Sequence, residues 1–228
     1  MPNLPILAVS LAIVGSAVGV ALAAISVRLP WDPETPRPSE SRPRETLSVG
    51  ASARYVLIAL AAAGIGVWAA LAGSGWLAIG ATAILGWQLL LIAVIDAEHF
   101  WLPDILTWPL AATGLVSGAL MSRGIPWSHL IGTIVGFGAL WAVAWLYRRV
   151  RGREGLGGGD PFLFAGAGAW VGWTGLPSVM MTACAVGLGL VLLRLLFRKS
   201  VHSDDQMAFG TFLAIGIWLT WLMGMPAV

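Results

Sequence analysis

The chain has 228 residues, of which 58% are hydrophobic and 11% are charged, and its formal net charge is +2. This composition excludes an ordinary soluble domain and is typical of a protein that crosses a membrane several times. The small excess of basic charge does not indicate a nucleic-acid partner. The arginines stand at the ends of apolar segments, where membrane orientation and anionic lipid account for them.

Apolar stretches of spanning length recur along the whole chain. A helix that crosses a bilayer needs roughly 20 apolar residues, and about eight segments approach this length: 4–27, 54–73, 75–95, 104–121, 125–147, 161–176, 178–197 and 207–224. The first is expected to be a retained helix rather than a signal peptide, since no Lys or Arg precedes it. We therefore predict an all-α polytopic bundle of about eight transmembrane helices, with residues 1–228 forming a single membrane domain.

The basic residues predict the orientation of this bundle. If the helices alternate in direction, every Lys and Arg except Arg123 falls on one side of the membrane. The positive-inside rule makes that side cytoplasmic, so both termini are expected to be periplasmic. The first cytoplasmic loop is then 28–53, a segment rich in Pro, Arg and Glu that contains no cysteine.

The third apolar segment ends in an acidic residue. Asp96 follows the run LGWQLLLIAVI (85–95) without a break. An acid at a helix C-terminus is unfavourably placed with respect to the helix dipole, and ionisable groups at membrane depth are candidate functional groups. The alternative is an interfacial carboxylate that simply reaches water. Glu98 is expected in the following loop, and Asp104 is expected to cap the next helix.

A second acid stands where another apolar segment begins. The stretch GREGLGGGDPFLFAGAGAWVGW (152–173) places Asp160 after three glycines and before Pro161. Asp followed by Pro is a common helix start, with Asp as the N-cap and Pro at the first helical position. The simplest interpretation is a capped membrane helix. A functional interpretation requires Asp96 as a partner, and both acids fall on the predicted cytoplasmic side.

Residues that usually bind metals are scattered along the chain. His99 in the loop after Asp96 has no second His or Cys to form a cluster with it, His129 and His202 are similarly isolated, and Cys184 is the only cysteine. The sequence therefore predicts neither a disulfide framework nor a zinc site.

The two acidic regions together resemble the signature regions of the type IV prepilin peptidases, membrane aspartic proteases of the GxGD class. The first signature, IDAEHFWLPDILTWPL, has an Asp at the end of an apolar helix and then Leu-Pro-Asp. The second is Glu-Gly-x-Gly-x-Gly-Asp, which stands here at 154–160. FGTFLAIGIWL (209–219) resembles the family's Phe-Gly-Pro-x-Leu segment, with Thr211 in the place of the proline. With VRLP (27–30) closing the first helix, the resemblance covers nearly the whole chain.

The resemblance implies an aspartic endopeptidase that removes the short basic leader from type IV prepilins or type II secretion pseudopilins. It implies a multi-pass protein of the bacterial inner membrane, in contact with lipid, with its active site facing the cytoplasm. By this resemblance Asp96 and Asp160 are the catalytic pair, and proteolysis needs no metal or cofactor. Five further residues are expected to bind or support the substrate: Glu98, Asp104, Glu154, Gly157 and Gly159. The acids would attract the basic leader, whereas the glycines either admit the substrate backbone or form only a flexible loop.

Two departures from the family pattern affect the expected activity. Many members carry two Cys-x-x-Cys pairs in the first cytoplasmic loop, and the 28–53 loop has none. This leaves open the family's second activity, methylation of the new pilin N-terminus, for which S-adenosylmethionine would be the cofactor. In addition, the family often has a Lys soon after the second Asp, where this chain reads Pro-Phe-Leu (161–163). The catalytic region is expected to span 85–228.

Two other classes of function are compatible with paired membrane acids. A proton-coupled transporter would use them to carry protons, although it also predicts a polar pathway across the bilayer, and the other helices offer almost no charge. A catalytically inactive assembly subunit of a secretion machine would keep the fold without the reaction. Cleavage of a prepilin distinguishes the peptidase from both.

Overall fold

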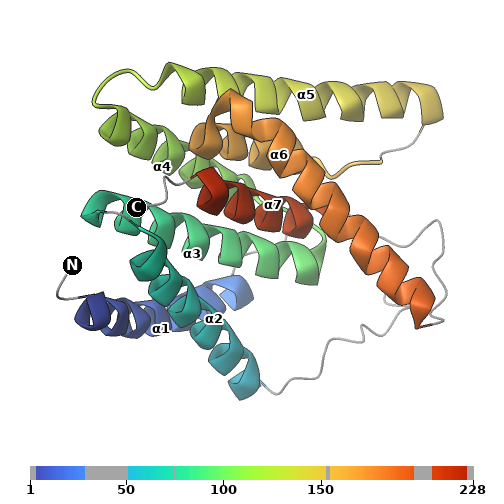
Figure 1. The fold of residues 1–228 in the computed structure, drawn as a ribbon. Helices are drawn as coiled ribbons and strands as arrows, with labels where there is room; N and C mark the ends of the chain where they lie inside the picture. The colour runs from blue at the N-terminus through green and yellow to red at the C-terminus, as the bar shows by residue number, and fades with distance from the viewer. Residues whose placement is uncertain (1–3, 29–50, 74, 153–154, 198–206, 225–228) are drawn as a thin grey trace. The chain divides into compact units, whose positions relative to one another are not determined.

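A computed structural model describes residues 4–28, 51–73, 75–152, 155–197 and 207–224. These residues form seven α-helices (Figure 1): α1 (Leu4–Arg28), α2 (Ala51–Ala72), α3 (Trp76–His99), α4 (Asp104–Ser122), α5 (Trp127–Arg151), α6 (Asp160–Leu196) and α7 (Phe209–Gly224). The contacts divide the chain into two compact units, Met1–Leu71 and Ala72–Val228.

The first unit is built on a close approach of α1 and α2. A Cβ added to Gly15 would overlap the backbone of Ala62, and one added to Gly66 would overlap the carbonyl of Leu11. Small residues therefore let the two backbones pack directly against each other, as is common where helices meet in membranes. At the other end of the pair, Arg54 donates a hydrogen bond of 2.8 Å to the hydroxyl of Ser26.

The second unit is organised around α6. This helix packs against α4, α5 and α7, and α7 in turn packs against α3. The core of this unit is made of apolar side chains, and the most deeply buried include Leu85, Ile92, Leu110, Leu163, Trp170, Val179, Leu213 and Ile217. The indole nitrogen of Trp170 donates to the carbonyl of Leu110 at 2.9 Å, so its polar atom is satisfied inside the core.

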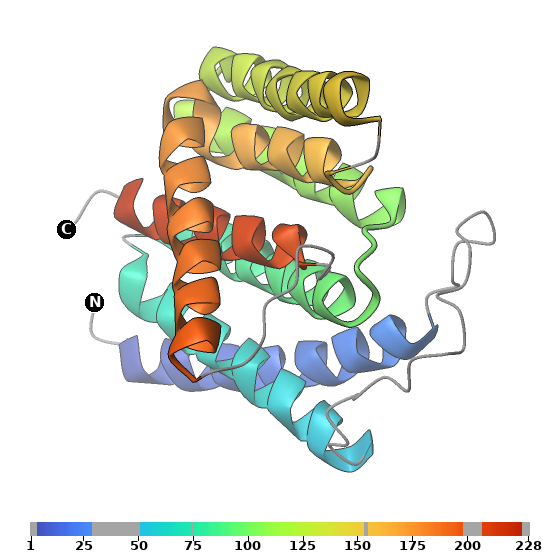
Figure 2. The same ribbon diagram turned by 90° about the vertical axis from the view of Figure 1, so that its right-hand side faces the viewer.

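A break divides α6 into two helical segments that run in different directions (Figure 2). Its 37 residues would form a straight helix roughly 55 Å long, well beyond the roughly 30 Å of a bilayer's hydrocarbon core. The break lies at Gly172, whose φ of 70° and ψ of 174° belong to a region that only glycine occupies readily. The predicted boundary, between 161–176 and 178–197, is therefore wrong by about one turn. The two segments themselves are present.

The end of α3 also differs from the sequence prediction. The helix runs to His99 instead of ending at residue 95, so Glu98 and His99 belong to its last turn and not to a loop. It ends because Phe100 adopts a left-handed conformation (φ 54°) and donates its N–H to the carbonyl of Asp96 at 2.8 Å. This turn directs the chain inward, and Leu102 becomes buried.

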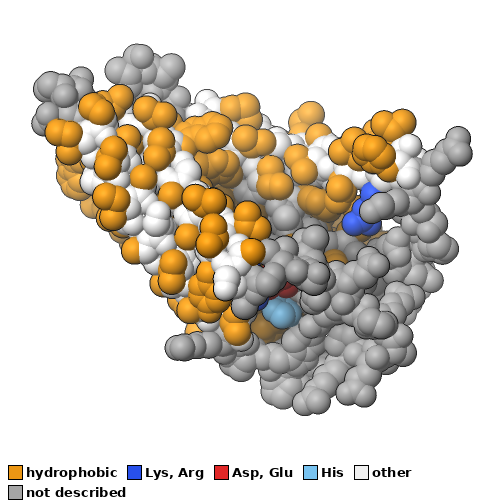
Figure 3. Space-filling view, turned by 90° about the horizontal axis from the view of Figure 1, so that it is seen from below, with side chains coloured by type: hydrophobic (Ala, Val, Ile, Leu, Met, Phe, Trp, Pro, Cys, Tyr) orange, Lys and Arg blue, Asp and Glu red, His pale blue; other side chains and the backbone are white. Residues whose placement is uncertain are grey.

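The fold is that of an all-α polytopic membrane protein, which confirms the predicted class. Six described helices are long and apolar enough to cross a membrane, and α7 is a shorter apolar helix. Large hydrophobic side chains are exposed on the outside, including Trp76 at 85% and Ile134 at 73%. Hydrophobic atoms cover most of the described surface in view, and the charged groups are confined to small areas (Figure 3). Such a surface suits lipid, and the orientation of the termini stays a prediction.

Candidate active site

Asp96 is held in place by the start of another helix. It lies in the last turns of α3 and is buried, with 4% of its surface exposed. Its Oδ2 accepts a hydrogen bond of 2.6 Å from the backbone N–H of Thr211 and one of 3.0 Å from the Thr211 hydroxyl. Thr211 is in the first turn of α7, where backbone N–H groups have no partner inside the helix. The carboxylate thus joins the end of α3 to the beginning of α7.

Asp160 is held by the turn that precedes its own helix. Its Oδ2 accepts a hydrogen bond of 3.0 Å from the N–H of Gly157, and its N–H donates to the carbonyl of Gly157 at 3.1 Å. The side chain is 4% exposed. Gly159 is the N-cap and makes no side-chain cap, so Asp160 is the first helical residue and Pro161 the second. The sequence prediction of Asp160 as the N-cap is wrong by one position, because the carbonyl of Gly159 already accepts a helical hydrogen bond from the N–H of Leu163 at 3.0 Å.

One buried side chain contacts both acidic regions. A Cβ added to Gly159 would lie 2.6 Å from Cβ of Leu102 and 2.8 Å from its carbonyl oxygen. A Cβ added to Gly210 would lie 2.6 Å from Cδ1 of Leu102 and 2.9 Å from Cγ of Asp96. Leu102 therefore packs between the glycine beside Asp160 and the glycine beside Thr211. Because these two glycines have no side chains, the C-terminal end of α3 meets the N-terminal ends of α6 and α7 on one side of the unit (Figure 1).

The two carboxyl groups lie near each other, and no basic side chain among the described residues forms an ion pair with either of them. Leu102 packs against Gly159, next to Asp160, and against Gly210, which contacts Asp96, so the two carboxyl groups lie at neighbouring helix ends. Among the residues that the structure describes, the contacts of both acids are hydrogen bonds from Thr211 and Gly157, and neither acid takes part in an ion pair. Two buried acids this close repel each other, which is costly for the fold and common at sites of acid–base chemistry.

The remaining expected site residues lie at different distances from this pair. Gly157 and Gly159 are part of the turn that holds Asp160. Glu98 and Asp104 are exposed, at the end of α3 and the beginning of α4. Asp104 is the first residue of α4 after the N-cap Pro103, and no side chain caps that helix. The predicted capping role of Asp104 is therefore wrong, and Glu154 lies outside the described residues.

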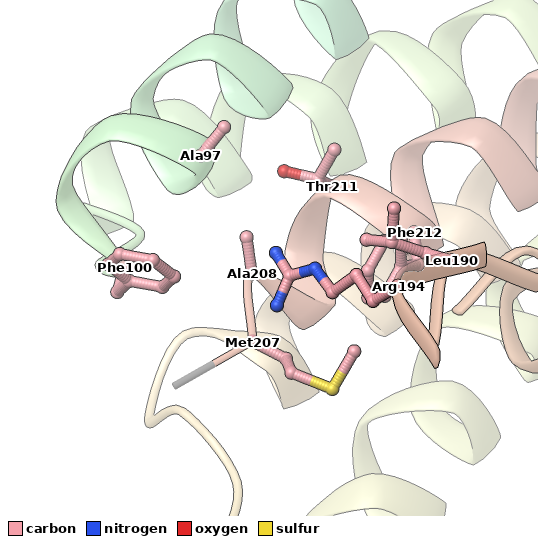
Figure 4. Close-up of a pocket in the computed structure, with 8 residues that line it drawn as sticks. All are labelled: Ala97, Phe100, Leu190, Arg194, Met207, Ala208, Thr211 and Phe212. Carbon is pink, nitrogen blue, oxygen red and sulfur yellow. The ribbon is translucent and has the colours of Figure 1, made fainter. Parts of the chain in front are cut away.

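A cavity adjoins the first of the two acids. It has a volume of about 220 Å³ and lies between the C-terminal ends of α3 and α6 and the N-terminal end of α7. Most of its lining is apolar, and Thr211 and Arg194 supply polar groups. The hydroxyl of Thr211 points toward the last turn of α3, while the guanidinium of Arg194 reaches toward Ala208 (Figure 4).

Sequence reasoning missed three residues of this arrangement. Leu102 had no signal, because nothing in a Phe-Trp-Leu-Pro stretch shows which apolar residue turns inward. Gly210 and Thr211 stood in a segment noted only for its similarity to a family pattern. The preference of small polar residues for helix starts was a usable signal for Thr211, although it could not identify Asp96 as the acceptor. In the described part of the chain, no three His, Cys, Asp or Glu side chains gather as metal ligands would.

Comparison with known proteins shows what this chain is similar to. The model of the type IV leader peptidase family matches residues 83–192, a range that contains both Asp96 and Asp160. The prepilin leader peptidase/N-methyltransferase of Pseudomonas aeruginosa is 39% identical over 174 residues, which are 75% of this chain and 59% of that protein. The protein of the same name from Dichelobacter nodosus is 39% identical over 174 residues, 76% of this chain and 59% of its own.

Further relatives are similar to this chain, but the similarity covers only part of their length. The prepilin leader peptidase/N-methyltransferase of Aeromonas hydrophila is 37% identical over 181 residues, 76% of this chain and 59% of that protein. The chain thus spans about three-fifths of the length of the curated relatives it matches. No solved structure matches the chain. Residues 83–192 of this chain are thus similar to the type IV leader peptidase family.

Proposed function

We propose that the chain is a membrane aspartic endopeptidase that removes the short basic leader from type IV prepilins or type II secretion pseudopilins. The observation that carries the proposal is the pair of buried carboxyl groups of Asp96 and Asp160 at adjoining helix ends. The names of the similar proteins, prepilin leader peptidase/N-methyltransferase, support the same reaction.

The hydrogen bonds leave one oxygen of each acid for chemistry. In the described part of the chain, the bonds to Asp96 and the bond to Asp160 all fall on Oδ2. Each carboxyl group is therefore anchored through Oδ2, and no described residue donates a hydrogen bond to Oδ1. Groups held in this way need little reorganisation when the substrate binds. Such preorganisation is a main source of the rate enhancement of enzymes.

Hydrolysis by two carboxyl groups requires one of them to be ionised and the other protonated. The ionised group accepts a proton from water, and the resulting hydroxide attacks the carbonyl carbon of the scissile peptide. The protonated group donates to the carbonyl oxygen, which gives a tetrahedral diol. As the C–N bond breaks, the first group passes the proton that it took from water to the leaving amine, and the second group recovers a proton from a hydroxyl of the diol. Repulsion within a close pair favours the state in which the two carboxyl groups share a single proton, which is the state that this mechanism needs.

The position of the pair fits a substrate that lies partly in the membrane. Both acids stand at the ends of apolar helices, Asp96 near the end of α3 and Asp160 at the start of α6. A prepilin has a basic leader in the cytoplasm and an apolar segment in the bilayer, so its cleavage site lies at the same boundary. We propose that the boundary is the cytoplasmic face of the bacterial inner membrane, in agreement with the positive-inside rule.

N-methylation of the product is a separate part of the proposal. The relatives' printed name includes N-methyltransferase, but this chain covers only part of their length, and its 28–53 loop carries no cysteine. Residues 29–50 of that loop lie outside the described residues. We propose that peptidase activity does not depend on this loop, and that S-adenosylmethionine is a cofactor only if methylation is retained.

The test is cleavage of a purified prepilin in reconstituted vesicles by the wild type, Asp96→Asn and Asp160→Asn, with product masses recorded. We expect the wild type to release the leader and each variant to lose more than about 10³-fold in kcat while eluting as a folded protein. An additional 14 Da on the product in the presence of S-adenosylmethionine would show methylation. Equal cleavage by all three proteins would contradict the assignment of the acids, and no cleavage by the wild type would favour a transporter or an inactive subunit.

A further inference from the structure

Thr211 lies outside the family's matched segment and hydrogen-bonds to one acid of the candidate pair. It lies 115 residues after Asp96 in the sequence and in a different helix, yet it directs two donors at the same oxygen of that carboxyl group. The match to the family model ends at residue 192. Its role therefore has to be argued from its contacts.

The two bonds restrain the Asp96 side chain from two directions. The backbone N–H is fixed by α7, and the hydroxyl is fixed by the rotamer of Thr211, since a β-branched side chain has few χ1 states in a helix. Both donors meet Oδ2, at 2.6 and 3.0 Å. A partial rotation about χ2 of Asp96 would break both bonds, and a half-turn would restore them with the equivalent oxygen. The arrangement therefore fixes the plane of the carboxyl group and the direction of its second oxygen.

The surroundings of Thr211 support a positioning role. Its hydroxyl also lies 3.2 Å from the carbonyl of Ala93, one turn before Asp96, so its single proton is shared between two acceptors on the same face of α3. Gly210 has no side chain, and a Cβ there would lie 2.9 Å from Cγ of Asp96, so this glycine provides the space that the carboxyl group occupies. The side chain thus has one favoured orientation.

We propose that Thr211 is a positioning residue of the peptidase, which fixes the Asp96 carboxyl group through Oδ2 so that Oδ1 faces the water and the scissile peptide. This inference rests on the proposed function. Thr211 acts through Asp96 and does not itself react. Loss of its hydroxyl should leave the acid present but less well oriented, which lowers the rate of the chemical step without removing the mechanism.

A graded set of variants tests this role. Thr211→Val keeps the shape and the backbone N–H but loses the hydroxyl, and we expect kcat to fall about tenfold with KM little changed. Thr211→Ser keeps both donors and should restore kcat to within about twofold of the wild type. The split between kcat and KM is needed because Thr211 also lines the 220 Å³ cavity, where a change in substrate binding would raise KM instead.

The matched control is Thr220→Val in the same helix. The Thr220 hydroxyl is buried without a hydrogen-bond partner among the described residues, and it lies nine residues further along α7, about 14 Å away along the axis. This variant should cleave as the wild type does. A fall in kcat as large as that of Thr211→Val would show a general effect on α7 and would overturn the proposal.

Two further outcomes separate this inference from the function beneath it. If Thr211→Val and Thr211→Ser both cleave as the wild type does, while Asp96→Asn is inactive in the same vesicles, the positioning role is wrong and the peptidase stands. If the wild type itself does not cleave, the proposed function fails first. Elution of each variant as a single folded species in detergent, with an unchanged Tm, is required before the rates are compared.

Discussion

Asp96 and Asp160 are equally buried, but the chain holds them in different ways. The partner of Asp160 is Gly157, three residues before it in the same turn. The partner of Asp96 is Thr211, 115 residues after it in another helix. One acid is therefore fixed by local structure and the other by the packing of α3 against α7.

This difference indicates which substitutions would displace each of the two acids. The position of Asp160 depends on a short glycine turn and on the room that Leu102 finds beside it. The position of Asp96 depends on a contact that forms only when distant parts of the chain have assembled. Substitutions in the turn should therefore affect Asp160 first, and substitutions at the start of α7 should affect Asp96 first.

The largest of these effects is expected at the local side, in Gly159→Ala. The new Cβ would lie 2.8 Å from the backbone oxygen of Leu102, and backbone cannot move aside as easily as a side chain. A displacement of about 1 Å at a catalytic group can cost about 10²-fold in rate, so we expect kcat to fall by about that factor. The measurement is prepilin cleavage under saturating substrate.

Its control is the neighbouring Gly158→Ala, since a Cβ there meets nothing within 4 Å. We expect this variant to keep most of the activity. Equal losses in Gly158→Ala and Gly159→Ala would mean that the glycines serve the approach of the substrate backbone rather than the packing of Leu102, which was the alternative that the sequence left open.

A smaller effect is expected at the remote side, in Gly210→Ala. The added methyl would lie 2.6 Å from Cδ1 of Leu102 and 2.9 Å from Cγ of Asp96, both on side chains that can shift. We expect a fall of about tenfold in kcat, since even a small shift of the Asp96 carboxyl group misplaces a reacting group. Gly138→Ala in α5, where a Cβ meets nothing within 4 Å, is the matched control. A larger loss of kcat in Gly210→Ala than in Gly159→Ala would mean that the remote support of Asp96 matters more than the local support of Asp160, which contradicts this expectation.

The smallest effect is expected from the exposed acids. Glu98→Gln and Asp104→Asn each remove a charge that we expect to attract a basic leader, and exposed charge pairs contribute at most about 1 kcal/mol. KM for the prepilin should therefore rise by no more than about fivefold at low salt, with kcat unchanged. The difference should disappear near 0.5 M salt, where exposed charges are screened. A loss of kcat in either variant would place that residue closer to the reaction than its exposure indicates.

Local features of the site could be predicted from sequence, and contacts between distant segments could not. The glycine run and the Asp-Pro pair indicate a turn followed by a helix, and the apolar run before Asp96 indicates a helix end. Even so, boundaries were missed by a few residues, because Phe100 rather than Asp96 ends α3 and Gly172 rather than Pro177 divides α6. In both places a positive φ decides the boundary, and Phe100 carries no sequence signal for one.

The pairing of Thr211 with Asp96 shows the other limit. The sequence marked Thr211 only as a departure from a proline, and it offered Gly210 no role at all. Their significance depends on where α7 begins relative to α3, which follows from the packing of Leu213 and Ile217 in the core of the second unit. Periodicity and capping preferences describe each helix alone and do not give this register.

The most direct test of the account is whether the two acids act as one unit. We would measure kcat for prepilin cleavage by Asp96→Asn, by Asp160→Asn and by the double variant in the same vesicles. If the acids form a single catalytic pair, the double variant should lose no more activity than either single variant, because each substitution already disables the unit. Losses that multiply in the double variant, or a single variant that still cleaves at the wild-type rate, would contradict the central claim.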